Sequence, residues 1–193
     1  MSRQRTTVLR VLIGASLFSS LCTAQVCRTF DSASAEDAIR SLDRGEIQTS
    51  YCTRAAFRLI EGLPLGQAVP ILIKHLNYNW PLSNEPHGLR SYPAVEALAD
   101  LGLAAEPPLI DFVAQHENES NIEHRNALEA LAMIHYFDAV PAIRLLRERS
   151  LAVAGTPAAR RLDSAADYMF KRFCPPAIRK RCEERLYQSD SKK

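Results

Sequence analysis

The segment HENESNIEH, which starts at residue 116, brings together side chains that could bind a metal ion. His116, Glu119, Glu123 and His124 are all ligand types, and they lie within nine residues. A metal site requires that such side chains converge on one point. The segment is also acidic, and Ser120 stands three residues before Glu123, as in a helix-capping box. We expect a solvated loop that caps the next helix, with metal binding as the alternative.

The cysteines are the other side chains with reactive chemistry. Cys22 falls in an N-terminal leader, which leaves Cys27, Cys52, Cys174 and Cys182. An even number in an exported chain indicates two disulfides and leaves no free thiol as a nucleophile. Three pairings are possible. A disulfide needs Cα atoms within about 7 Å, and the two ends of an elongated repeat protein lie far apart. We therefore expect Cys27–Cys52 and Cys174–Cys182.

Motifs of common enzyme classes are absent from the sequence. There is no Gly-x-Gly-x-x-Gly, no phosphate-binding loop, no Gly-x-Ser-x-Gly and no Cys-x-x-Cys. His75, His87 and His135 stand apart from one another, as surface or satisfied interior histidines do. We expect no catalytic residues and no cofactor.

The first 24 residues have the three parts of a secretory signal peptide. Arg3, Arg5 and Arg10 make a basic head, an apolar run follows from residue 11 to 21, and Ala24 offers a small residue for cleavage. A spanning helix needs about 20 apolar residues, so a retained anchor is a weaker alternative. A lipoprotein at Cys22 is another, because Leu21 before it is bulky where a small residue is expected. We predict export, with a secreted or periplasmic mature chain.

Helix signals recur along the chain, and long alternating strand patterns do not. Capping residues and glycine stops predict helices from Ser34 to Gly45, from Thr49 to Glu61, from Ser91 to Gly102, and after Asp138 and Thr156. The predicted fold class is all-α. One domain spans residues 25–188, and residues 189–193 (SDSKK) form a disordered tail.

A repeat of 33 residues organises the middle of the chain. The shift places Val95 on Leu128 and Leu98 on Leu131, which are apolar positions of one helical stripe. It also places Pro108 on Pro141, in the first turn of a second helix, where a missing amide hydrogen costs little. A fainter copy carries Pro70. Repeated helical hairpins stack because one hairpin cannot bury its apolar stripe alone.

This pattern resembles HEAT repeats, and in particular the short kind found in phycobilisome lyase-like proteins. The resemblance is clearest over residues 91–149, weaker over 49–76 and absent at both ends. It implies a short α-solenoid of about three HEAT-like hairpins with disulfide-stapled terminal caps, in the armadillo-like class. Such repeats serve mainly as protein-binding scaffolds. The lyase activity is not carried over, because nothing here resembles a bilin site.

Charge is distributed unevenly along a nearly neutral mature chain. Without the three leader arginines, 21 basic residues face 22 acids, which gives no argument for nucleic-acid binding. Residues 85–138 carry ten acids and two bases, whereas residues 160–193 carry ten bases and five acids. The asymmetry would steer a charged partner or an anionic membrane towards the basic C-terminal hairpin. Solvated faces are the alternative.

Two surfaces are predicted to bind a protein or peptide. The first is the long loop around residues 77–92, whose Tyr78, Trp80, Arg90 and Tyr92 are typical of interface hot spots. The alternative is that Trp80 fills a gap between two misfitting repeats. The second surface consists of the positions three and seven residues after each repeat proline, which should form rows on the inner face: Ile73, Asp111 and Arg144, then Asn77, Gln115 and Glu148.

The sequence therefore favours an exported, non-enzymatic scaffold for protein–protein interaction, such as an adaptor or an assembly factor. The alternative is an enzyme or a carrier of a small ligand or metal. Its site would lie near the loops at residues 77–92 and 116–124.

Overall fold

All regular secondary structure in the described residues is helical, as the sequence predicts. The computed structural model describes residues 34–45, 50–78, 92–116 and 121–188. The helices are α2 (Ala35–Asp43), α3 (Ser50–Glu61), α4 (Leu65–Lys74), α5 (Pro93–Asp100), the 3-10 helix η2 (Gly102–Ala105), α6 (Glu106–Gln115), α7 (Ile122–Ile134), α8 (Ala139–Ala152), α9 (Pro157–Phe173) and α10 (Arg179–Tyr187).

Several predictions fall outside the described residues: the signal peptide at 1–24, Cys27, Trp80, Arg90 and the tail at 189–193. In the part of the chain that the structure describes, no helix is both long enough and apolar enough to cross a bilayer.

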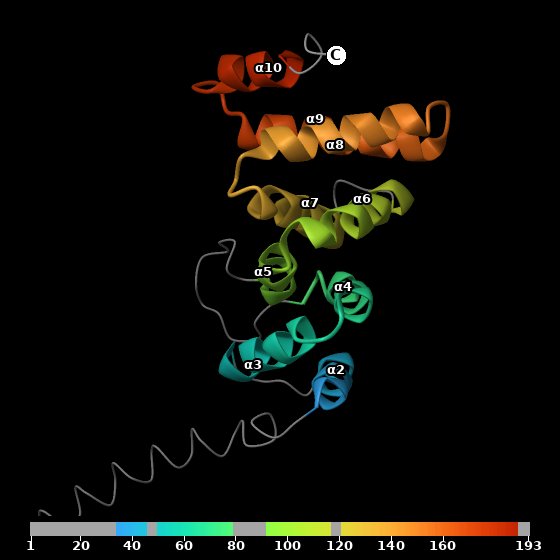
Figure 1. The fold of residues 1–193 in the computed structure, drawn as a ribbon, viewed down its shortest axis with the longest axis vertical. Helices are drawn as coiled ribbons and strands as arrows, with labels where there is room; N and C mark the ends of the chain where they lie inside the picture. The colour runs from blue at the N-terminus through green and yellow to red at the C-terminus, as the bar shows by residue number, and fades with distance from the viewer. Residues whose placement is uncertain (1–33, 46–49, 79–91, 117–120, 189–193) are drawn as a thin grey trace, which may run out of the picture.

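The helices follow one another along the long axis of the molecule, from α2 at one end to α10 at the other (Figure 1). Helix α5 packs against α3 and α7, and α6 packs against α7 and α9. One continuous apolar cluster runs through the stack, from Ala38 in α2 to Leu186 in α10. Each helix therefore buries its apolar side against the helices on either side of it.

Local signals set where most of the helices begin. Ser34 and Asp37 form a complete capping box at the start of α2. Asp138 caps α8 and Thr156 caps α9, each through a side-chain oxygen that accepts a backbone N–H. The prediction for α7 was wrong by one residue: Asn121 rather than Ser120 caps it, by accepting the backbone N–H of Glu123.

The repeat correctly identifies the apolar core. Leu128 and Leu131 on α7 are completely buried, as is Leu98, the α5 counterpart of Leu131. The matched pair Val113 on α6 and Leu146 on α8 is completely buried too. Pro108 and Pro141 stand third in α6 and α8, inside the first turn. Pro70 does not: it lies inside α4, five residues after Leu65. The helix starts earlier because the extended backbone of Pro64 leads directly into it.

The helices pair differently from a simple succession of hairpins. The most extensive contact of α8 is with α9 rather than with α7, the partner that the repeat gives it. The two helices lie side by side and antiparallel in Figure 1. Ser150 near the end of α8 donates its hydroxyl hydrogen to the carbonyl of Ala159 at 3.1 Å, which fixes the turn between them.

The C-terminal disulfide prediction is confirmed. Cys174, just after α9, is bonded to Cys182 in α10, and their Cα atoms lie 6.2 Å apart. Cys52 in α3 is also disulfide-bonded. Its pairing with Cys27 stays a prediction, because Cys27 lies outside the described residues.

Helix α2 is tied to the end of α4 by a small ionic cluster. Lys74 Nζ donates to Asp43 Oδ1 at 2.7 Å, and His75 Nε2 lies 3.3 Å from the same oxygen. His75 is buried, and this burial lowers the pKa of its imidazole despite the opposing charge of Asp43; the neighbouring Lys74 lowers it further.

Leu131→Ala should destabilise the fold by about 2–5 kcal/mol, because it leaves a cavity in the fully buried α7 stripe. Urea unfolding measures the loss. The matched control is Leu151→Ala, at an exposed position of α8, which should change the free energy of unfolding by less than about 0.5 kcal/mol. Equal losses in the two variants would contradict the assigned core.

The lowered pKa of His75 makes stability depend on pH. The unfolded chain takes up the proton first as pH falls through about 6.5, so stability should decrease between about pH 7 and pH 5. His75→Gln removes this term, and its unfolding free energy should fall less over the same range. Urea unfolding at several pH values tests the difference. A steeper fall in the variant would show that the sign is wrong.

Candidate functional site

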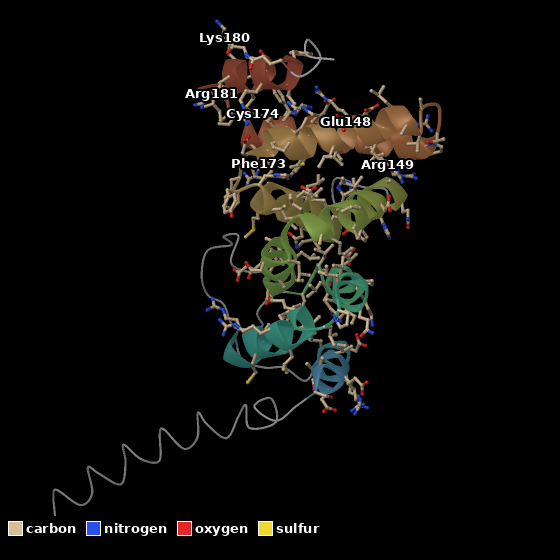
Figure 2. The ribbon with its side chains drawn as sticks, viewed as in Figure 1. Glu148, Arg149, Phe173, Cys174, Lys180 and Arg181 are labelled. Carbon is tan, nitrogen blue, oxygen red and sulfur yellow. A yellow bond between two sulfur atoms is a disulfide. The ribbon has the colours of Figure 1, made fainter. Side chains whose placement is uncertain are left out.

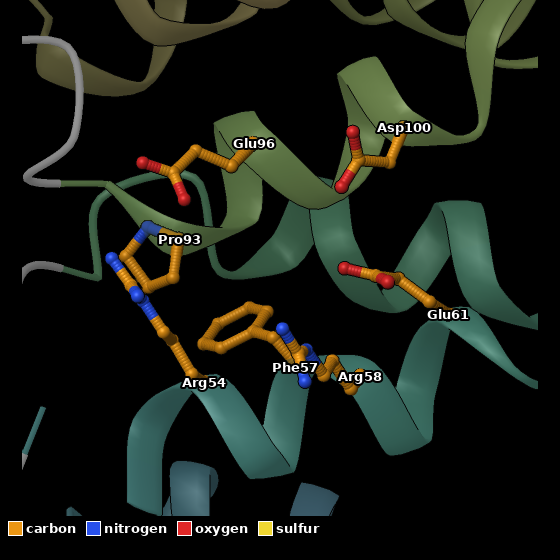
Figure 3. Close-up of a pocket in the computed structure, with 7 residues that line it drawn as sticks. All are labelled: Arg54, Phe57, Arg58, Glu61, Pro93, Glu96 and Asp100. Atoms are coloured by element: carbon orange, nitrogen blue, oxygen red, sulfur yellow. The ribbon is translucent and has the colours of Figure 1, made fainter. Parts of the chain in front are cut away.

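A charged pocket lies between α3 and α5, with a volume of about 220 Å³. Its lining comprises Arg54, Phe57, Arg58 and Glu61 from α3 with Pro93, Glu96 and Asp100 from α5 (Figure 3). The arginines lie on the α3 side, with the ring of Phe57 between them, and two of the carboxylates lie on the facing α5 side. The pocket therefore offers both signs of charge around one aromatic side chain.

Helical periodicity explains why these side chains share one space. On α3 the lining residues follow Arg54 by three, four and seven positions, and on α5 they follow Pro93 by three and seven. Such spacings place side chains on one face of a helix. The packing of α3 against α5 turns the two faces towards each other. Phe57 is almost fully buried at the base of this contact, so the pocket has a rigid floor.

The carboxylates repel one another across the pocket. Partial burial raises the pKa of Glu61, and the negative charges of Asp100 and Glu96 raise it further. The guanidinium of Arg58 opposes the shift by favouring the carboxylate form. A positive group placed between Glu61 and Asp100 would relieve this repulsion. The carboxylate side of the pocket thus favours a cation, and the arginine side favours an anion.

The lining limits the chemistry of the pocket. Its described residues include no serine, cysteine or histidine, so they do not supply the usual pairing of a nucleophile with a base. Among the described residues, no group of three or more His, Cys, Asp or Glu side chains is placed to hold a metal ion. Charged and aromatic contacts are what this pocket supplies.

The predicted inner-face rows take part in contacts between helices. Asn77 donates to Glu123 Oε1 at 2.7 Å, and Asp111 accepts from Arg149 at 3.1 Å. Arg144 donates to the backbone carbonyl of Arg185 at 2.9 Å. These three side chains therefore link successive parts of the stack, and a role in partner binding stays a prediction.

The remaining members of the rows differ in exposure. Ile73 is half-buried against the core, whereas Gln115 on α6 and Glu148 on α8 are exposed. Figure 2 marks Glu148 beside Arg149, the residue that reaches Asp111 of α6. Gln115 and Glu148, like the exposed Asn77, are thus accessible to a partner.

The described part of the 77–92 loop packs on the core. Tyr78 is half-buried, and its ring centroid lies 5.8 Å from that of Phe57, the floor of the pocket. Burial raises the pKa of the Tyr78 hydroxyl, which a hydrogen bond with Thr53 partly offsets. Tyr92 also packs against the core. Trp80 and Arg90 lie outside the described residues, so their predicted role in binding is untested.

The two histidines of the proposed metal segment have separate surroundings. His116 is exposed at the end of α6, where its ring stacks on Phe112 at a centroid distance of 4.1 Å. Its Nδ1 lies 2.8 Å from the carbonyl of Phe112. His124 is buried in the first turn of α7. Glu119 lies outside the described residues.

Sequence reasoning missed the pocket on α3 and α5. A signal was present, since Arg54, Phe57, Arg58 and Glu61 repeat with helical spacing. It was indistinguishable from an ordinary amphipathic helix until α5 was known to face it. Comparisons with known protein families, with curated proteins and with solved structures find no match to the chain.

Glu61→Gln should stabilise the protein at neutral pH, because it removes a half-buried charge beside Asp100. Because the pKa of Glu61 is raised in the folded state, ionised Glu61 destabilises the fold. This cost is absent at low pH and develops as pH rises above about 4.5. The stability gap between variant and wild type should therefore widen from about pH 4 to pH 7. Urea unfolding at both values measures this gap, with the exposed Glu183→Gln as control. A gap that narrows with pH would contradict the electrostatics.

Proposed function

We propose that this chain is a non-enzymatic scaffold that acts outside the cytoplasm and binds a protein or peptide partner. Its architecture would be a short α-solenoid of HEAT-like hairpins. The 33-residue repeat supports this reading, and so does the succession of helices along one axis in Figure 1. The Cys174–Cys182 disulfide supports an oxidising compartment, in line with the predicted signal peptide.

The observation that carries the proposal is the size and lining of the α3–α5 pocket. Sites for drug-sized ligands usually enclose about 300–1,000 Å³, and this pocket has about 220 Å³. It suits one or two side chains of a partner better than a whole cofactor. A basic side chain would meet Glu61 and Asp100, and an acidic one would meet Arg54 and Arg58.

A small-ligand enzyme or carrier is the alternative, and one feature favours it. Two carboxyl groups whose environments separate their pKa values can serve as an acid and a base, and Glu61 beside Asp100 has a raised pKa. The lining residues that the structure describes offer no serine, cysteine or histidine for them to assist. We therefore rank this alternative below protein binding.

The test uses the oxidised mature chain, residues 25–193, with chemical crosslinking and mass spectrometry against an envelope or secreted fraction. A partner captured by the wild type should crosslink near Lys74, or next to the pocket or to Gln115 and Glu148. The double variant Arg58→Ala with Glu61→Ala should weaken the isolated partner's affinity by about tenfold or more, the loss expected from interface hot spots.

The matched control is Arg125→Ala with Glu183→Ala, which removes the same charges from exposed positions on α7 and α10. It should leave the affinity within about twofold. If both double variants bind the partner as well as the wild type, the pocket is not the site. Turnover or saturable binding of a small molecule, lost in Glu61→Gln, would replace the proposal with the alternative.

A further inference from the structure

The turn between α7 and α8 exposes aromatic side chains on a strained backbone. Tyr136 and Phe137 are consecutive, and both have positive φ angles, 53° and 63°. Bulky residues rarely adopt this left-handed conformation, which glycine adopts at little cost. Tyr136 is nevertheless 94% exposed, and Phe137 is 45% exposed. Neither the backbone nor the apolar core of the fold benefits from a tyrosine here.

Hydrogen bonds and ion pairs hold this turn in place. The amide of Phe137 donates to the carbonyl of Ala132 at 2.8 Å. Both terminal nitrogens of Arg185 in α10 donate to the two carboxylate oxygens of Asp138, at 3.0 and 2.5 Å. His135 contacts the carboxylate of Glu106. The strained turn is therefore rigid and has a defined position relative to α10.

Helix α10 begins with three consecutive cations, Arg179, Lys180 and Arg181. All three are exposed, and the first turn of the helix contains no acid. The start of a helix already carries partial positive charge, so cations there cost stability. Within the described residues none of the three forms an ion pair. The described residues thus show no ion pair through which these three cations would stabilise the fold.

The aromatic turn and the basic turn lie on one edge of the molecule. The Asp138–Arg185 pair joins the α7–α8 turn to α10, and the Cys174–Cys182 disulfide joins the end of α9 to α10. Figure 2 shows Arg181 and Phe173 close to Cys174 at this edge, with Lys180 beyond them. Ile178, which is 46% exposed, precedes the three cations. The connection between α7 and α8 and the start of α10 thus lie on the same side of the molecule in Figure 1.

We propose that this aromatic–basic edge, formed by Tyr136, Phe137, Ile178, Arg179, Lys180 and Arg181, binds an acidic peptide segment of a partner protein. The cations would pair with its carboxylates, and the exposed rings would pack on its side chains. Tyrosine and arginine are the residue types that dominate such contacts. The edge is separate from the α3–α5 pocket, so this proposal can be correct even if the pocket binds nothing.

Charge and burial favour an acidic peptide over an anionic membrane. A helix that lies on a bilayer needs a free apolar face to insert. The apolar side chains of α10 within its helical turns, Cys182 and Leu186, are instead buried against the protein. Apart from Tyr187, the exposed side chains of α10 are polar or charged, with Glu183 and Glu184 following the three cations. The three leading cations can pair with the carboxylates of a flexible acidic chain.

The experiment measures binding of a fluorescent polyglutamate peptide to the oxidised mature chain by anisotropy, with polyglutamine of the same length as control. The wild type should bind polyglutamate alone, and rising salt should weaken the binding. The triple variant Arg179→Gln, Lys180→Gln, Arg181→Gln should lose about tenfold or more in affinity. Arg125→Gln, at an exposed position of α7, should bind as the wild type does.

Tyr136→Gly separates binding from folding. Glycine relieves the positive φ, so the variant should be at least as stable as the wild type in urea, yet it should bind polyglutamate several-fold more weakly. A purely structural tyrosine would move both measurements the same way. The control is Leu103→Ala, which removes an apolar side chain of a residue 66% exposed in the 3-10 helix η2, and it should leave binding unchanged.

Two outcomes would overturn the proposal. One is that the wild type shows no detectable polyglutamate binding, or that the triple variant and Tyr136→Gly both bind polyglutamate with the affinity of the wild type. The other is Tyr136-dependent capture by phosphatidylglycerol vesicles, but not by phosphatidylcholine vesicles, without polyglutamate binding. That result would assign the edge to a membrane surface instead.

Discussion

Short helices leave many backbone groups without partners, and this constraint shapes the whole stack. The last carbonyl oxygens of each helix accept no hydrogen bond from within that helix. Most of these helices are also too short to be stable alone. Side chains from other helices supply the missing donors. Asn126 of α7 donates to the carbonyl of Leu76 just after α4, and Arg161 of α9 donates to that of Ala114 in α6, both at 2.6 Å. Arg144 of α8 does the same for Arg185 in α10.

These polar links complement the burial of apolar stripes. Helix α7 is buried along most of its length, and its alanines at positions 127, 130 and 132 allow close approach of neighbouring helices. The burial of apolar surface drives the stacking of the helices, but it does not specify the position of one helix along another. Directional hydrogen bonds such as Asn126 to Leu76 do so, because an unpaired buried amide would be costly. The stack is thereby rigid enough to present fixed surfaces.

The two surfaces proposed for binding have different physical origins. The α3–α5 pocket is a place where two helical faces meet without filling the space between their charged side chains. The aromatic–basic edge is a place where a strained turn and an unfavourably charged helix start are held together by Asp138 and Arg185. Both depart from what stability alone would select, and such departures are where function is expected in a folded chain.

The sequence by itself determined what depends on neighbours a few residues away. The capping box of Ser34 and Asp37, the apolar stripe containing Leu128 and Leu131, and the Cys174–Cys182 disulfide are all local, and all are present. Only the tertiary structure decided the α3–α5 pocket, the preference of α8 for α9, and the use of Asn77 and Arg144 as links between helices. The links made by Asn77 and Arg144 span 46 and 41 positions of the chain. The energies of all three features depend on how whole helices dock, which no short-range pattern encodes.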